Sequence, residues 1–96
     1  MSLRDAAVLI DAALEDNITA VREALEKGID INSRDFFGKT ALMHVLFYGH
    51  TETAKLLIEK GADVNARDIV GGTALRHASL KGHTETVSIL KTSGAL

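Results

Sequence analysis

The chain has 96 residues, of which 46% are hydrophobic and 25% charged, and its formal net charge is −2. This length suits one small domain, residues 1–96. The absence of cysteine excludes disulfides, thiol nucleophiles and thiolate zinc sites. The weak negative charge argues against nucleic acid or an anionic membrane as partner, and no apolar run is long enough to span a bilayer. We therefore expect a soluble, cytoplasmic (intracellular) protein.

The sequence repeats itself with a period of 33 residues. Three segments recur at this offset: residues 28–35, 38–44 and 49–53 match residues 61–68, 71–77 and 82–86. A fixed period between about 20 and 50 residues indicates an architecture of stacked structural repeats.

Each repeat predicts two short helices joined by a tight turn. In the central repeat Thr40 is a good N-cap, and Leu42, Val45 and Leu46 form an apolar stripe at helical spacing. Gly49 ends this helix, because glycine adopts the left-handed conformation without steric cost.

The second helix of the central repeat is predicted to start at Thr51, with its hydroxyl as the cap, and to end at Gly61. Residues 62–71 are polar and rich in turn-forming types, so they predict an extended finger between repeats.

These motifs resemble those of the ankyrin-repeat family over nearly the whole chain. They are Gly-x-Thr-x-Leu at the first helix, Gly-His between helices, and Lys-Gly-Ala-Asp-Val-Asn-Ala-Arg-Asp at residues 60–68. The resemblance implies an all-α ankyrin-repeat solenoid of three stacked helix-turn-helix units with two extended β-turn fingers. It implies no cofactor.

Two departures from the family pattern stand at the start of the first helix. The family's Thr-Pro-Leu-His reads Thr-Ala-Leu-Met at residues 40–43 and Thr-Ala-Leu-Arg at residues 73–76. Proline is therefore missing at the first helical turn, where its fixed φ would fit. Met43 and Arg76 replace the family's histidine, so we expect its hydrogen bonds to the finger to be lost.

The two outer repeats have the polar character of caps. Glu23 stands where the central repeat has Leu56, and Lys91 stands where it has Ile58; terminal repeats need such a polar outer face. We divide the chain into an N-terminal capping repeat (1–35), a central repeat (36–68) and a C-terminal capping repeat (69–96). We expect a complete three-repeat protein, the alternative being a fragment of a longer array.

The resemblance places partner contacts on the fingers and on the exposed side of each first helix. The candidate contact residues are Phe36, Phe37, Lys39, Met43, Phe47, Tyr48, Ile69, Val70, Arg76, Leu80 and Lys81. All four aromatic residues of the chain belong to this set, and exposed aromatic side chains are common at interface hot spots. Phe37 and Tyr48 are the favoured anchors. Phe47 could equally stack between repeats, because its repeat equivalents are also apolar.

Charge is distributed unevenly over the three repeats. The formal net charge is −4 for residues 1–35, zero for residues 36–68 and +2 for residues 69–96. A partner segment with apolar anchors and some acidic residues would complement the candidate contact set.

No catalytic or metal site is indicated. The four histidines form two repeat-equivalent pairs, whose members should lie roughly 8–10 Å apart, too far to share a zinc ion. We therefore predict a non-catalytic monomer that binds another protein, with no nucleic-acid or membrane partner and no metal. Self-association through the oppositely charged ends is the alternative, and a small-molecule binder or enzyme has less support because shallow repeats enclose little volume.

Asn65 needs a separate note. Together with Leu57, Asp63 and Val64 it resembles the ankyrin segment that asparaginyl hydroxylases modify in animals. We interpret it instead as a structural asparagine that hydrogen-bonds within the finger turn.

Overall fold

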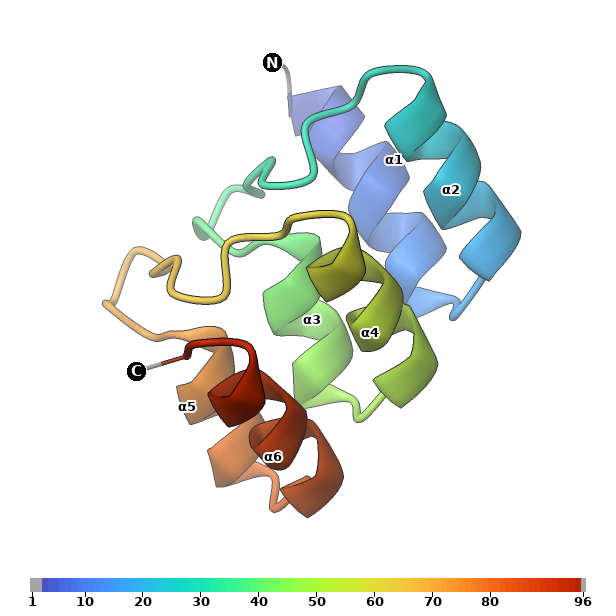
Figure 1. Cartoon of the computed structure of the whole chain (residues 1–96). Helices are drawn as coiled ribbons and strands as arrows, with labels where there is room; N and C mark the ends of the chain where they lie inside the picture. Colours follow the sequence, from blue (N-terminus) through green and yellow to red (C-terminus); the bar gives the residue numbers. More distant parts are fainter. Residues whose placement is uncertain (1–2, 96) are drawn as a thin grey trace.

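The computed structural model describes residues 3–95, which form three stacked pairs of antiparallel helices (Figure 1). The helices are α1 (Leu3–Leu14), α2 (Ile18–Glu26), α3 (Ala41–Phe47), α4 (Thr51–Glu59), α5 (Ala74–Leu80) and α6 (Thr84–Thr92). The first helices of the pairs (α1, α3, α5) form one layer and the second helices (α2, α4, α6) form the other (Figure 1). Within the described residues, β structure is limited to one antiparallel bridge between Arg67 and Thr73. The predicted all-α repeat solenoid is confirmed.

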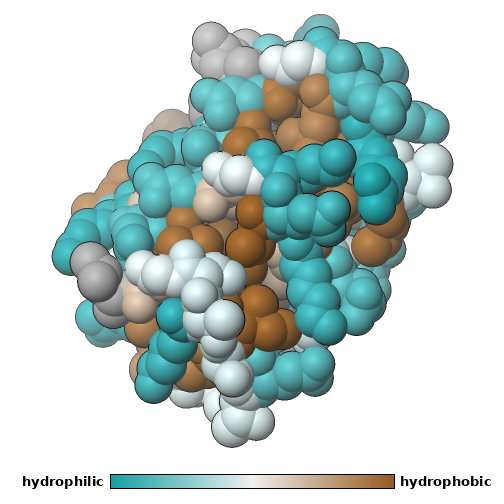
Figure 2. All heavy atoms as spheres, viewed as in Figure 1, coloured by the Kyte–Doolittle hydropathy of each residue, from teal (hydrophilic) through white to brown (hydrophobic). Residues whose placement is uncertain are grey.

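Apolar side chains between successive helix pairs form the core. α3 packs against α1, α4 and α5, so the central pair is covered on both sides. Leu42, Val45 and Leu46 of α3 and Leu57 of α4 are at most 1% exposed. Viewed from the side of the second helices, hydrophobic side chains show between successive pairs and hydrophilic ones cover much of the outer edge (Figure 2). The predicted stripe on the first helix is therefore the buried one.

Threonine hydroxyls cap the two short first helices, as the sequence predicts. The Thr40 Oγ1 accepts a hydrogen bond from the Met43 backbone N–H at 3.3 Å, and Thr73 Oγ1 accepts from Arg76 at the same distance. Each cap satisfies one of the backbone donors that a helix start leaves unpaired.

The second helix of the central repeat starts at Thr51, as predicted, but without the predicted cap. His50 is the N-cap of α4, without a side-chain hydrogen bond, and Thr51 is already the first helical residue. The Thr51 hydroxyl donates instead to the carbonyl of Gly49 at 3.4 Å. The prediction of a Thr51 hydroxyl cap is wrong. Thr51 stands one position after the N-cap, and its hydroxyl is used as a donor to Gly49 and accepts no N–H group of the first turn.

The turns between paired helices also contact the neighbouring repeat. Gly49 has a φ of +71°, and a Cβ added to it would lie 2.9 Å from the His83 ring. The His83 Nε2 donates to the Phe47 carbonyl at 2.9 Å. At the equivalent position of the first repeat, Asp16 has a φ of 55° and accepts a hydrogen bond from the buried Thr53 hydroxyl. The turns of the first and second repeats are therefore each fixed by a polar contact from the next repeat.

The two loops between repeats (residues 27–40 and 60–73, the fingers) project to the same side of the stack (Figure 1). The Asn32 Oδ1 accepts from the Asp63 backbone N–H at 2.8 Å, which ties the first finger to the second. The Asn65 amide donates to the Gly94 carbonyl at 3.1 Å. Asn65 thus links its finger to the segment that follows α6, beyond the finger turn in which we expected its bond.

Replacing Gly49 by alanine should destabilise the fold more than the same change at Gly82. Both residues have positive φ, which costs an L side chain about 1–2 kcal/mol. A Cβ added at Gly49 would also meet the His83 ring, whereas a Cβ added at Gly82 would have no atom of a residue other than its chain neighbours within 4 Å in the described part of the chain. Urea unfolding of the two variants measures the difference. Equal losses would show that the His83 contact does not constrain the turn.

Ala41→Pro should raise the free energy of unfolding by about 0.4–1 kcal/mol, because proline restricts the unfolded chain. Ala41 is the first helical residue, and the preceding Thr40 is extended with φ −92° and ψ 167°, which suits a residue before proline. Thermal and urea unfolding test the change, with Ala74→Pro as the equivalent substitution in the third repeat. A lower melting temperature in both variants would contradict the helix start.

Candidate functional site

A carboxylate organises each fingertip. The Asp35 Oδ1 accepts the backbone N–H groups of Phe37 and Lys39, both at 2.9 Å. In the second finger the Asp68 Oδ1 accepts those of Val70 and Gly72, at 3.0 and 2.8 Å. Because these aspartates hold the turn from inside, the side chains at the tips project outward.

A histidine on the first helix binds the second oxygen of each carboxylate. The His44 Nε2 lies 2.8 Å from Asp35 Oδ2, and the His77 Nε2 lies 3.0 Å from Asp68 Oδ2. An ionised carboxylate only accepts hydrogen bonds, so Nε2 carries the proton. The expected loss of the helix-to-finger bond is therefore wrong. The histidine one residue after Met43 or Arg76 reaches the finger in place of the family's histidine.

The pKa values of both aspartates lie below the ordinary value. Burial by itself would raise the pKa of Asp68, whose side chain is 1% exposed, but hydrogen bonds from Gly72, Val70 and His77 outweigh burial and lower it. For Asp35, burial likewise opposes hydrogen bonds from His44 and the backbone, and the pKa is again lowered. Both carboxylates are therefore ionised at neutral pH.

Four exposed apolar residues of the candidate set lie at the fingertips. Phe36 is 80% exposed and Val70 is 84% exposed, and Phe37 and Ile69 are also exposed. The Ile69 N–H donates to the Phe37 carbonyl at 3.1 Å, so the two tips lie side by side. The structure thus brings together four apolar side chains that the sequence places 33 residues apart.

A hollow of about 270 Å³ lies beside the fingertips, between α3 and α5. It is lined by Lys39, Met43, His44, Phe47, Tyr48 and His77. Met43 is only 1% exposed. Its side chain belongs to the packed side of α3 and borders the hollow from beneath, so a partner could reach it only through the hollow, and its place in the contact set stays a prediction.

Phe47 connects the second and third repeats. Its ring is perpendicular to the Tyr48 ring at 5.0 Å and to the His77 ring at 6.4 Å between centroids. The Lys81 ammonium lies 4.8 Å from its centroid, within the range of a cation–π interaction. Phe47 is half-buried and packs between repeats, whereas Tyr48 is exposed.

Three cations of the candidate set belong to the second and third repeats, and two of them lie at the hollow or over its Phe47 ring. Lys39 lines the hollow, Lys81 lies over Phe47, and Arg76 is exposed on α5. Within residues 3–95 none of the three forms an ion pair with a carboxylate. Arg76 and Leu80, although exposed, do not line the hollow. We call the hollow, the fingertips and these three cations the recognition face.

Two features at or beside this face were not predicted from the sequence as parts of the candidate site. One is the pair His44 and His77, whose signal was their own 33-residue spacing. The other is a groove of about 350 Å³ between α1 and the first fingertip. Its lining is Ala7, Ile10, Asp11, Leu14, Asp35, Phe36 and His44.

Comparison with known proteins agrees with the repeat geometry. A family model described as "Ankyrin repeats (3 copies)" matches residues 9–95. The chain belongs to the ankyrin-repeat family, whose repeats are generally protein–protein interaction modules and typically non-catalytic.

Two curated plant proteins are similar over part of the chain. They are the probable E3 ubiquitin-protein ligase XBOS33 of Oryza sativa subsp. japonica and the E3 ubiquitin-protein ligase XBAT33 of Arabidopsis thaliana. Each is 43% identical over 47 residues, which is 49% of this chain and 9% of the relative. The matched region is thus a small part of either ligase.

No helix in residues 3–95 combines the length and apolar character needed to cross a membrane. In the same part of the chain, no three histidine, aspartate or glutamate side chains are grouped so that they could hold a metal ion.

The two fingertip carboxylates, Asp68 buried and Asp35 half-buried, should make stability pH-dependent. Because their pKa values are lowered on folding, their contribution is complete at neutral pH and is lost as the pH falls below about 4, the ordinary aspartate value. Urea unfolding between about pH 7 and about pH 3 should show a steeper loss for the wild type than for Asp35→Asn, Asp68→Asn. Parallel curves would contradict the role of the two carboxylates.

Proposed function

We propose that this chain is a non-catalytic recognition module that binds another protein through its recognition face. The observation that carries the proposal is the combination of exposed apolar fingertips, an aromatic hollow and nearby cations that form no ion pair within residues 3–95. Large exposed apolar patches are unusual on monomeric proteins and mark interaction sites. The family's general role in protein binding supports the same conclusion.

Binding would insert apolar groups of the partner against Phe37 and Tyr48. Both rings are more than half exposed, so they would bury a large area on contact, and a ring has few rotamers to lose. Lys39, Arg76 and Lys81 would orient the partner and raise its association rate. The hydrogen-bonded turns beneath the fingertips reduce the entropy cost of binding.

Other classes of function have weaker support. The hollow of about 270 Å³ and the groove of about 350 Å³ lie at the lower limit of the usual size of small-molecule pockets, roughly 300–1,000 Å³. Self-association would have to leave the recognition face unused or cover it with a second copy. Light scattering over a concentration series tests that alternative directly.

Phe37→Ser, Tyr48→Ser should abolish capture of the partner. Truncation of a central aromatic anchor costs about 2 kcal/mol or more of binding free energy. Wild type and variant would serve as baits in a lysate of cells that produce the protein, with captured proteins identified by mass spectrometry and their affinities measured by calorimetry. Circular dichroism would first show that the variant folds.

The matched control is Val8→Ser, which removes an exposed apolar side chain of α1 outside the candidate contact set. Proteins captured by wild type and control but not by the double variant support the proposed face. Proteins captured equally by all three baits would show that another surface binds them.

A further inference from the structure

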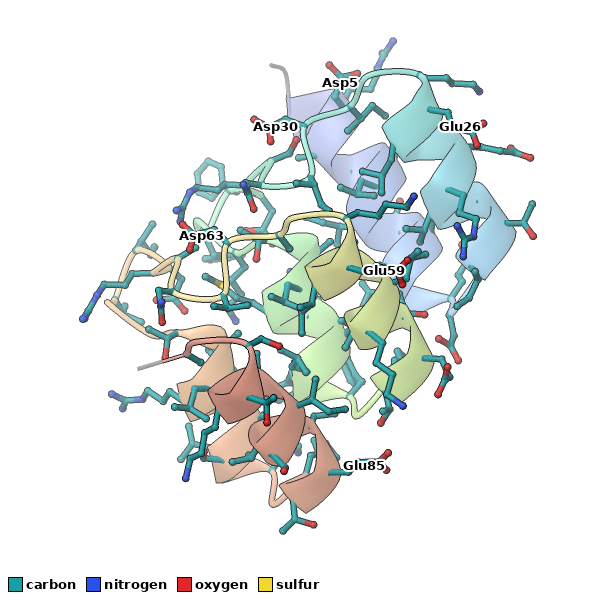
Figure 3. The ribbon with its side chains drawn as sticks, viewed as in Figure 1. Asp5, Glu26, Asp30, Glu59, Asp63 and Glu85 are labelled. Carbon is teal, nitrogen blue, oxygen red and sulfur yellow. The ribbon has the colours of Figure 1, made fainter. Side chains whose placement is uncertain are left out.

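The recognition face is electrostatically polarised along the stack. Residues 35–50 and 68–83, the fingertips and first helices of the second and third repeats, contain Lys39, Arg76 and Lys81 and two acidic residues, the fingertip carboxylates Asp35 and Asp68. The equivalent residues 2–17 of the first repeat contain one arginine and four acidic residues. Figure 3 shows the acidic Asp5, Glu26 and Asp30 around one end of the first helix pair.

Within residues 3–95, Lys39, Arg76 and Lys81 form no ion pair with a carboxylate. The two fingertip carboxylates, Asp35 and Asp68, bind backbone N–H groups and His44 and His77 instead. The cations of the second and third repeats are therefore left to interact with a partner. A charged group placed beside an apolar, partly dehydrated hollow acts more strongly than one in open water.

Two apolar sites lie side by side across this gradient. The hollow between α3 and α5 has Lys39 on its rim, whereas the groove between α1 and the first fingertip has Asp11 on its rim. His44 lines both, so they adjoin. Their separation is one interhelix spacing, about 8–10 Å, which an extended peptide covers in about three residues.

We propose that the partner presents an extended, charge-polarised segment with two apolar residues about three positions apart. Its acidic end lies over α3 and α5, and its basic end lies over α1. One apolar side chain fills the hollow and the other fills the groove. This inference rests on the proposed function, because it assigns the chemistry of the partner to the same face.

Selection from a library of random dodecapeptides displayed on phage tests the inference. Wild type is the target, and enriched peptides are then measured against variants by fluorescence anisotropy at low and high salt. Lys39→Gln, Arg76→Gln, Lys81→Gln removes the cations of the face. Lys55→Gln, Lys60→Gln, Lys91→Gln makes the same charge change on the α4 and α6 side. Melting curves confirm that both variants fold.

The expected peptides carry acidic residues at one end, basic residues at the other and two apolar residues between. Their Kd should rise about tenfold with the face variant and much less with the control, and Asp11→Lys should also weaken them. The loss should be smaller at high salt.

Other outcomes separate this inference from the proposed function. Some peptides could lose binding to Phe37→Ser, Tyr48→Ser and yet show no charge pattern, or bind the face variant and the control variant equally. Either result would overturn the charge-polarised partner and leave the recognition face intact. Peptides that bind Phe37→Ser, Tyr48→Ser as well as wild type would overturn both. A selection that enriches no common pattern would overturn the inference.

Discussion

The structure depends on apolar contact between successive helix pairs. A single pair of short helices cannot bury both of its sides, and only a neighbour on each side can remove side chains such as Leu42 and Leu46 from water. The polar contacts at the turns, such as that of His83 with the Phe47 carbonyl, fix the position of one helix pair relative to the next. Stability is therefore shared between neighbours and is not a property of any one repeat.

The same stacking makes the recognition face a single surface. The two fingers lie side by side. They are joined by the bond from the Asp63 N–H to Asn32 and by the bond from the Ile69 N–H to the Phe37 carbonyl, so the apolar tips of different repeats are adjacent. Inside each tip the carboxylate of Asp35 or Asp68 satisfies the backbone donors. The tips can thus present large apolar side chains to solvent and still keep a defined backbone, which favours rigid binding.

Histidine has a structural role throughout the described part of the chain. His44 and His77 bind the fingertip carboxylates, and His83 supports the turn of the preceding repeat. His50 stacks on Tyr48 with 6.2 Å between ring centroids. These contacts give each of the four repeat-equivalent histidines a structural role.

The sequence by itself determined the period, the helix starts at Thr40 and Thr73, the end of the first helix at Gly49 and the family. These features are local or repeat at a fixed spacing, so each can be read along the chain. The exposure of Phe36, Phe37, Ile69 and Val70 could also be predicted from the sequence, because these residues lie in the loops between repeats and not on a helix.

Only the tertiary structure decided which side chains of the short first helices face inward. Met43 is buried and His44 reaches the finger, because the rotation of a seven-residue helix is set by its neighbours on both sides. The hollow and the cation over Phe47 likewise form between residues of different repeats. A period of 33 residues shows that positions are equivalent, but it does not show which of them touch across the stack.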